Sequence, residues 1–176
     1  MRLRVAPLHV MYQKKLTRWL IALIIWIGFL GFSGGVRSLT DVEEAYRPYL
    51  ADYPSLRTAI TLFRLLVGAG VAAWAYTAWV LYRRVPGTLG RAQTCLVIGA
   101  LLRVAGGYSI PFFGGLPADV ATTLTREAFP FTVFVLLFTG IWYLYLARSQ
   151  EVREIYARHE SADREEETEE EEAPSA

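Results

Sequence analysis

Two arginines lie inside long apolar stretches of this sequence, and their type and position point most directly to a function. Arg64 follows Leu56 by eight residues, and Arg103 precedes Ile110 by seven. If both stretches are helical, each arginine lies roughly 10–12 Å from the same end of the helix pair. Arginine inside a membrane span is costly and usually faces protein or water. We therefore expect the two guanidinium groups to lie at one depth and to face inward.

Small residues share the helix faces of both arginines. They are Gly68, Ala72 and Ala75 beside Arg64, and Gly99, Gly106 and Gly107 beside Arg103. Such residues at helical spacing mark surfaces where membrane helices pack closely. The functional interpretation is one basic pocket, open to the outer side, that binds an anion such as a lipid headgroup. The structural alternative is that each arginine pairs with Glu127, a loop acid or a free carbonyl, or extends outward to the membrane surface.

Glu127 is the acid that we expect beside the two arginines, because it lies at the outer end of the fourth apolar stretch. Pro130 frees the carbonyl of Arg126 in a helix there, which adds an acceptor at the same place. A lone carboxylate at this boundary is an ion-pair partner, is solvated or is a proton-relay acid, and the first two are the commoner cases. The candidate ligand-binding set is therefore Arg64, Arg103 and Glu127.

The sequence contains no residue set typical of an enzyme. It has no Ser/His/Asp arrangement, paired core carboxylates or phosphate-binding loop. Cys95 is the one cysteine, and His9 and His159 lie in polar terminal segments, so ligand sets for haem, zinc and iron–sulfur are missing. The net charge is +1, without the basic stripe of a nucleic-acid-binding protein. We predict a protein that is not an enzyme, has no cofactor or metal and binds no nucleic acid.

Four apolar stretches must position these residues. Hydrophobic residues make up 53% of the 176, and the charged 20% concentrate at the chain ends and in three short intervals. About 20 apolar residues of helix are needed to cross roughly 30 Å of hydrocarbon. Because the connections are short, we predict an all-α integral membrane bundle of four antiparallel up-down transmembrane helices. The predicted spans are residues 19–36, 56–82, 89–110 and 124–147.

The remaining segments are assigned from their composition. Residues 1–18 form a basic cytoplasmic N-terminal segment, 37–56 a polar loop and 111–117 an apolar turn. In the transmembrane domain, 19–158, the fourth helix is expected to continue as a cytoplasmic extension to about 158. The residues expected on one face of that extension are Val152, Ile155 and Tyr156. The acidic tail, 159–176, repels itself and is predicted to be disordered.

Lysine and arginine near the span ends set the expected orientation. Eight lie on the side of the N-terminus and four on the other side, mixed with acids. Both termini are therefore predicted to be cytoplasmic. A secretory signal peptide is the alternative for residues 19–36, but this apolar run is longer than the core of a usual signal peptide.

The end of the fourth stretch, residues 141–153, resembles the end of the last helix in the small YdgK-like family of bacterial four-span membrane proteins. The positions that match the family's pattern are Trp142, Tyr145, Ser149, Val152 and Arg153. Leu144 stands where the family has proline, and Glu151 where it has a basic residue. Shorter matches are Trp19-Leu20, Tyr53-Pro54 and Arg84-Val85-Pro86. At Phe63-Arg64 the family has a Phe-Glu pair, so the charge is reversed here.

This resemblance covers roughly residues 14–156. It implies a bacterial inner (plasma) membrane location and four spans. It implies no activity, because the family is one of unknown function.

Three classes of function follow from these observations. We favour a non-enzymatic membrane module that packs with a partner protein, with a second copy of itself or with lipid. The alternative is a small transporter or channel with an outward-facing anion or lipid-headgroup site around Arg64 and Arg103. An enzyme at the outer surface is the third, for which only Glu127 and loop acids are present. The expected partners are the lipid bilayer and either another membrane protein or a homo-oligomer.

Overall fold

A computed structural model of the chain describes residues 18–83, 88–150, 152–154 and 156. Almost all of the predicted basic segment, the whole acidic tail and Ile155 lie outside the described residues. Within the described part of the chain, every regular element is a helix.

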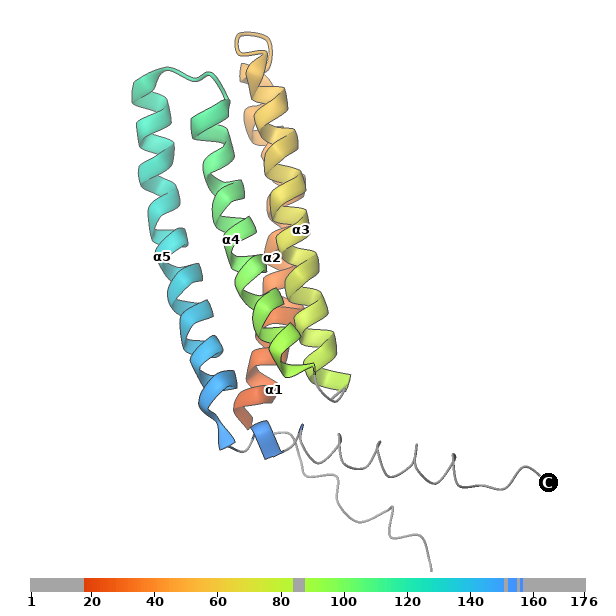
Figure 1. The fold of residues 1–176 in the computed structure, drawn as a ribbon. Helices are drawn as coiled ribbons and strands as arrows, with labels where there is room; N and C mark the ends of the chain where they lie inside the picture. The colour runs from red at the N-terminus through yellow and green to blue at the C-terminus, as the bar shows by residue number, and fades with distance from the viewer. Residues whose placement is uncertain (1–17, 84–87, 151, 155, 157–176) are drawn as a thin grey trace, which may run out of the picture.

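Four long helices run up, down, up and down beside one another (Figure 1). The first is composite and contains α1 (Arg18–Ile25), the π-helix η2 (Trp26–Gly31), α2 (Phe32–Tyr46) and the 3-10 turn η3 (Arg47–Tyr49). The others are α3 (Ser55–Arg83), α4 (Leu89–Phe113) and α5 (Ala118–Arg148). All four are long and apolar enough to cross a membrane. The prediction of an all-α fold with four such helices is confirmed.

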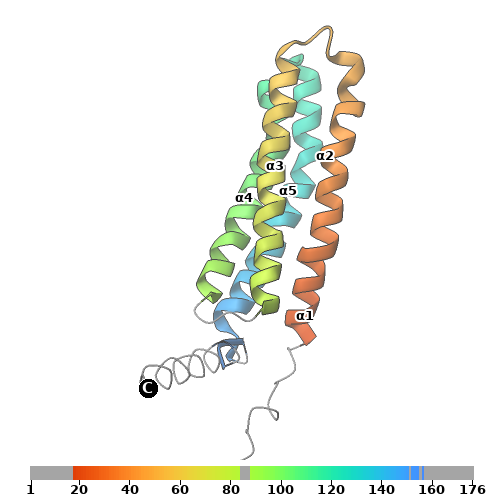
Figure 2. The ribbon, with the colours of Figure 1, turned by 90° about the vertical axis from the view of Figure 1, so that its right-hand side faces the viewer.

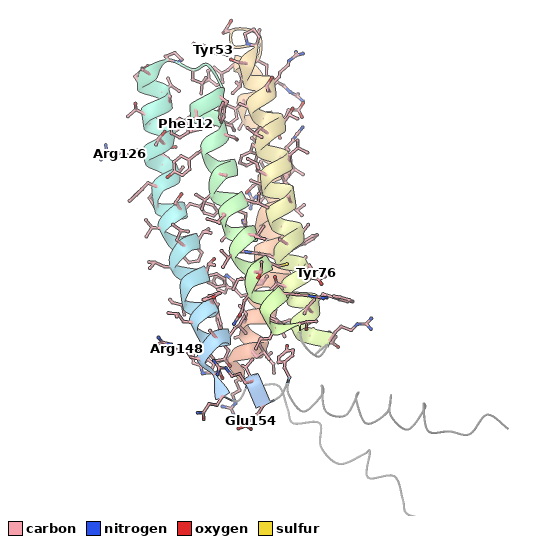
Figure 3. The ribbon with its side chains drawn as sticks, viewed as in Figure 1. Tyr53, Tyr76, Phe112, Arg126, Arg148 and Glu154 are labelled. Atoms are coloured by element: carbon pink, nitrogen blue, oxygen red, sulfur yellow. The ribbon has the colours of Figure 1, made fainter. Side chains whose placement is uncertain are left out.

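We call the end of the bundle with the α2–α3 and α4–α5 connections the turn end. The opposite end, where α1 begins and α5 finishes, is the terminal end. Tyr53 lies at the turn end, and Arg148 and Glu154 lie at the terminal end (Figure 3). From the side, α5 lies behind α3 and between α4 and the first helix (Figure 2).

The first helix is longer than predicted, because residues 37–49 are helical instead of forming a polar loop. Arg37 Nε and Asp41 Oδ2 lie 3.3 Å apart, one helical turn from each other. Pairs of this spacing support an exposed helix. Val42, on the other side, is buried in a cluster with residues of α3 and α4. A solvated polar face and a buried apolar residue are enough to continue the helix to Tyr49.

The α4–α5 turn is also shorter than predicted. Helix α4 continues through Pro111 to Phe113, and α5 begins at Ala118. Gly115 has a positive φ of 66°. The Ser55 hydroxyl donates a hydrogen bond to the Gly114 carbonyl at 2.9 Å. This bond joins the start of α3 to the turn.

Gly115→Ala is expected to destabilise the protein by about 1–3 kcal/mol, because other residues are strained in the left-handed region. A Cβ there would also lie 2.3 Å from Ser55 Oγ. Gly34→Ala is the control, since Gly34 is helical with open space around it and alanine favours a helix. Thermal unfolding in mild detergent measures both variants. Equal stability of the two variants would contradict this role of the turn.

The chain bends after the fourth helix, in place of the straight extension expected from the sequence. Ser149 is extended, with φ −66° and ψ 113°. Beyond it, Val152 and Tyr156 are buried, and they are two of the three residues that the sequence places on one face. The Tyr156 hydroxyl donates to the Leu81 carbonyl at 2.8 Å. This segment therefore packs against the bundle instead of extending from it.

Two hydrophobic clusters hold the helices together. The terminal cluster consists of Leu20, Leu23, Ile27, Trp74, Ala78, Val80, Leu81, Ala92, Leu96, Ala100, Val135, Leu146, Val152 and Tyr156. The turn cluster consists of Val42, Leu56, Ala59, Ile60 and Ile110, with Tyr46, Leu50, Tyr53, Phe63, Leu116 and Leu124 packed against it. Arg103 belongs to neither cluster.

Helices α3 and α4 make the most extensive contact among the described helices. A Cβ on Gly70 would lie 2.8 Å from the Gly99 carbonyl oxygen, and one on Gly99 would lie 3.0 Å from the Gly70 carbonyl oxygen. A Cβ on Gly106 would lie 2.6 Å from Val67. Gly99 and Gly106 of α4 thus lie in a close helix contact, as their pattern predicts, whereas Gly107 has open space around it. On α3 the contact glycine is Gly70 in place of Gly68, whose nearest neighbour lies 4.0 Å away.

Candidate functional site

Arg103 lies where all four long helices meet. Its guanidinium donates a hydrogen bond through Nη1 to the Gly31 carbonyl of the first helix at 3.3 Å. Its Cζ lies 4.6 Å from the centre of the Trp74 ring on α3 and 5.9 Å from that of Phe131 on α5. The residue is only 8% exposed. A single permanent charge therefore lies in the interior of the bundle.

The direction of helix α4 explains this position. Side chains on an α-helix tilt toward its N-terminus. Because α4 begins at the terminal end, the Arg103 side chain is directed away from the nearer, turn end of the helix. Its stem passes Gly70, where a Cβ would lie 2.7 Å from the Arg103 Cγ. The guanidinium reaches Trp74 and Gly31 instead of the surface.

The charge on Arg103 has few partners. A guanidinium has five N–H donors and stays charged in proteins. In the part of the chain that the structure describes, it forms one hydrogen bond, to Gly31, and Nε is buried without a partner. Within the described residues, no carboxylate forms an ion pair with it. The faces of Trp74 and Phe131 offer cation–π attraction, which compensates for only part of the lost hydration.

Trp74 is held firmly beneath the guanidinium. Its Nε1 donates to the Leu96 carbonyl at 3.0 Å. A Cβ on Gly31 would lie 3.1 Å from this ring, and a Cβ on Gly99 would lie 2.3 Å from it. The Phe138 ring lies 5.8 Å away, centre to centre. These contacts show that Trp74 packs in the interior of the bundle.

The π-helix η2 supplies the carbonyl that Arg103 uses. Gly31 is the last residue of this segment. A π-turn contains one residue more than its i→i+4 counterpart, and such segments occur often at functional sites. Because each turn there accommodates an extra residue, the faces of α1 and α2 are offset. No residue pattern in the sequence indicates this segment, so the Gly31 contact was not predicted.

A cavity of about 240 Å³ adjoins Arg103. Its lining comes from all four long helices: Ser38, Phe63, Val67, Arg103, Gly107, Ala128 and Phe131. Gly107 lies about one turn from Arg103, and Val67 about one turn from Gly70, each toward the turn end. The guanidinium therefore lies at the end of the cavity nearer the terminal cluster. Apart from Arg103 and Ser38, the lining is apolar.

Arg64 lies in a different place. Its Nη2 is 2.7 Å from Glu43 Oε2, and both side chains are partly exposed. Helix α3 begins at the turn end, so this arginine tilts toward that end, opposite to Arg103. It lines a second cavity, of about 320 Å³, together with Glu43, Leu50, Arg57, Ile60 and Thr61.

The structure therefore replaces the single shared pocket expected from the sequence with two cavities. The first-helix partners of Arg64 and Arg103 are Glu43 and Gly31, which are twelve residues apart. At the α-helical rise this separation is roughly 18 Å. The two guanidinium groups do not lie at one depth.

Glu127 pairs with neither arginine within the described part of the chain. It is exposed on α5. The neighbouring Arg126 points away from the bundle (Figure 3). Arg64 takes Glu43 in place of Glu127, because the first helix continues past the predicted span and brings its own acids alongside α3.

Substitutions of the two arginines are expected to be additive. Arg64→Ala removes an exposed ion pair and should cost at most about 1 kcal/mol. Because the two residues share no partner, the double variant with Arg103→Ala should differ from the sum of the single effects by no more than about 0.5 kcal/mol. Denaturant unfolding in detergent micelles measures all three variants. A coupling well above this limit would show that the two cavities communicate.

The fold and the site together define a class: an all-helical bundle with four helices long enough to cross a membrane and a buried arginine at their junction. No protein-family model, no curated protein and no solved structure matches the chain. The resemblance to the YdgK-like family stays a prediction.

Proposed function

We propose that this chain is a non-enzymatic multi-pass membrane protein that binds a ligand with an anionic headgroup between its helices. The observation that carries the proposal is the buried, incompletely paired guanidinium of Arg103 beside a cavity of about 240 Å³. This is the lipid-binding form of the membrane module expected from the sequence. The partly exposed Arg64 gives it no direct support.

Energetics favour an anionic occupant. A buried charge without a counter-charge costs several kcal/mol, even after relaxation. A carboxylate or phosphate accepts two parallel hydrogen bonds from one edge of a guanidinium. Nη1 is engaged by Gly31 and Nε has no partner among the described residues, so the guanidinium keeps unused donors for such a ligand. Binding would supply the charge that the described residues lack.

The shape of the cavity suits ligand binding better than transport. Toward the terminal end, the guanidinium rests on the buried Trp74 ring and the terminal cluster. A transporter or channel path would have to cross this packed region. The closed end therefore supports binding as the first function and leaves transport as the weaker alternative.

A groove on the outside of α4 and α5 supports packing with another helix as the second candidate function. This groove, of about 310 Å³, is lined by Thr139 and Gly140 of α5 and Ala100 of α4, among others. The Thr139 hydroxyl is buried without a hydrogen-bond partner. Small and hydroxyl residues are enriched where membrane helices associate. The oligomeric state of Gly140→Leu, compared with the natural chain in one detergent, tests this function.

The location that we propose is a bacterial inner membrane, with both termini in the cytoplasm. Its support is the Lys/Arg bias and the four long apolar helices. Reporters fused at the N- and C-termini should be active in the cytoplasm. Reporters inserted after Asp52 and after Gly115 should be active outside. An externally active C-terminal reporter would show that the number of spans is odd.

Binding is tested with the protein in phosphatidylcholine nanodiscs, with thermal shift as the measurement. The probes are chloride, acetate, palmitate and phosphatidylglycerol. At least one should raise the unfolding temperature of the natural chain and of Arg64→Met. Arg103→Met should lose the shift and yet fold, because replacing a buried charge by an apolar residue of similar volume is often neutral or stabilising. No shift with any probe, or an equal shift in Arg103→Met, would remove the proposed function.

A further inference from the structure

We infer that the ligand is a single-chain amphiphile with a terminal carboxylate, which enters the cavity sideways between α2 and α5. The inference rests on the proposed function and names its ligand. It follows from where the cavity is open, where it is closed and what its charged end can hold.

The opening of the cavity faces the side of the bundle. Its two exposed lining residues are Ser38 on α2 and Phe131 on α5, the latter 43% exposed. Among the described helices, α5 packs closely along α4 and approaches the first helix much less. Aromatic side chains provide the contact between the first helix and α5: the Trp26 ring lies 6.4 Å from that of Phe134 and 5.7 Å from that of Phe138, centre to centre. The edge between α2 and α5 is thus the least tightly packed part of the cavity wall.

Both ends of the bundle are closed to the cavity. Toward the turn end lies the turn cluster, against which Tyr46 of α2 and Leu124 of α5 pack. Phe63 lines the cavity and packs against this cluster as well. Toward the terminal end, Trp74 and Phe138 lie beneath the guanidinium. A ligand therefore arrives through the surface that meets the acyl chains, which favours an amphiphile over a free aqueous anion.

The charged end of the cavity suits a carboxylate. One guanidinium carries one positive charge, which a carboxylate matches one to one. Two N–H groups on one edge of a guanidinium can donate parallel hydrogen bonds to both carboxylate oxygens. The volume of about 240 Å³ lies below the roughly 300–1,000 Å³ of sites for drug-sized ligands. It accommodates a small headgroup and the first part of a chain, whereas a phosphodiester brings substituents on both sides.

The rest of the lining suits the chain of such a ligand. Val67, Ala128 and Phe131 present apolar surface to the cavity. The Ser38 hydroxyl at the rim already donates to the Gly34 carbonyl at 2.9 Å. A chain that leaves the headgroup at Arg103 would cross these apolar residues and continue into the bilayer.

Equilibrium binding of radiolabelled palmitate to the protein in phosphatidylcholine nanodiscs tests the inference. We expect saturable binding of one palmitate per chain, at least tenfold tighter than that of acetate or chloride. Methyl palmitate, which lacks the charge, should not compete. Gly107→Leu should weaken palmitate binding at least tenfold, because Gly107 lines the cavity and has open space where the side chain would go.

Gly90→Leu is the matched control, since Gly90 is exposed on the same helix, has open space and lies away from the cavity. It should change palmitate binding less than twofold. If Gly107→Leu fails to fold, Ala128→Phe fills the same cavity from α5 and should give the same loss.

The outcomes separate this inference from the proposed function. Acetate or chloride binding as tightly as palmitate, still dependent on Arg103, would overturn the sideways amphiphile and keep an anion site. Arg103-dependent competition by phosphatidylglycerol in preference to palmitate would replace carboxylate by phosphate. Palmitate binding that neither Gly107→Leu nor Ala128→Phe weakens would overturn the assigned cavity. Absence of binding by every probe would overturn both.

Discussion

Replacing Gly99 with leucine is expected to prevent the chain from forming this bundle. A Cβ at this position would lie 2.3 Å from the Trp74 ring and 3.0 Å from the Gly70 carbonyl oxygen. The ring is held by its hydrogen bond to Leu96, and the carbonyl belongs to the backbone of α3. Neither neighbour can move without separating α3 from α4. The cost should exceed the roughly 1–3 kcal/mol of ordinary overpacking.

Gly90→Leu adds the same side chain to the same helix, at a position with open space. Size-exclusion chromatography and thermal unfolding in mild detergent compare the two variants. We expect Gly90→Leu to be monodisperse, with an unfolding temperature close to that of the natural chain. We expect Gly99→Leu to aggregate or to yield little folded protein. A folded Gly99→Leu variant of normal stability would show that α3 and α4 are not in backbone contact.

Trp74→Ala is expected to cost about 3–5 kcal/mol, the range for removing a large buried aromatic side chain. The substitution would remove the hydrogen bond to Leu96 and leave a void between Gly31 and Gly99. It would also remove the ring that faces the Arg103 guanidinium at 4.6 Å. Because the void adjoins a charge, water should enter it, and hydrogen exchange of the surrounding amides should become faster.

Trp79→Ala is the comparison for this substitution. Trp79 belongs to the same helix, but it is 50% exposed. Its removal should change stability by less than about 1 kcal/mol. Denaturant unfolding followed by circular dichroism measures both variants. Similar losses for Trp74→Ala and Trp79→Ala would mean that Trp74 is not part of the packed interior.

The four long helices were predictable, because the length of each apolar stretch can be read directly from the sequence. The polar residues 37–49 were misassigned for a related reason. Their composition suggests a loop, but the Arg37–Asp41 pair and the buried Val42 stabilise a helix there. Tertiary contacts with α3 decide the outcome, and those contacts are not visible in local composition. For Arg64, the structural alternative of a pairing with an acid of the predicted loop is confirmed by Glu43, whereas Glu127, the partner expected first, is not used.

The depths of the two arginines were predicted from Cα positions alone, which was not enough. Their side chains tilt in opposite directions, because α3 and α4 run in opposite directions. The predicted topology already contained this information, so the tilt rule would have separated Arg64 from Arg103. In contrast, the π-helix and the Gly31 carbonyl have no signal in the sequence. Their position depends on how the first helix packs against Trp74.

The junction at Arg103 has a consequence for how the chain is assembled during synthesis. The third hydrophobic segment carries a charge whose protein contacts come from segments made earlier, Gly31 and Trp74, and from one made later, Phe131. Alone in lipid, this segment would be inserted with difficulty, since an unaccompanied arginine disfavours integration. Beside the first two helices, its guanidinium would contact the Gly31 carbonyl and the Trp74 ring. In a membrane, the helices made earlier would thus assist the insertion of α4.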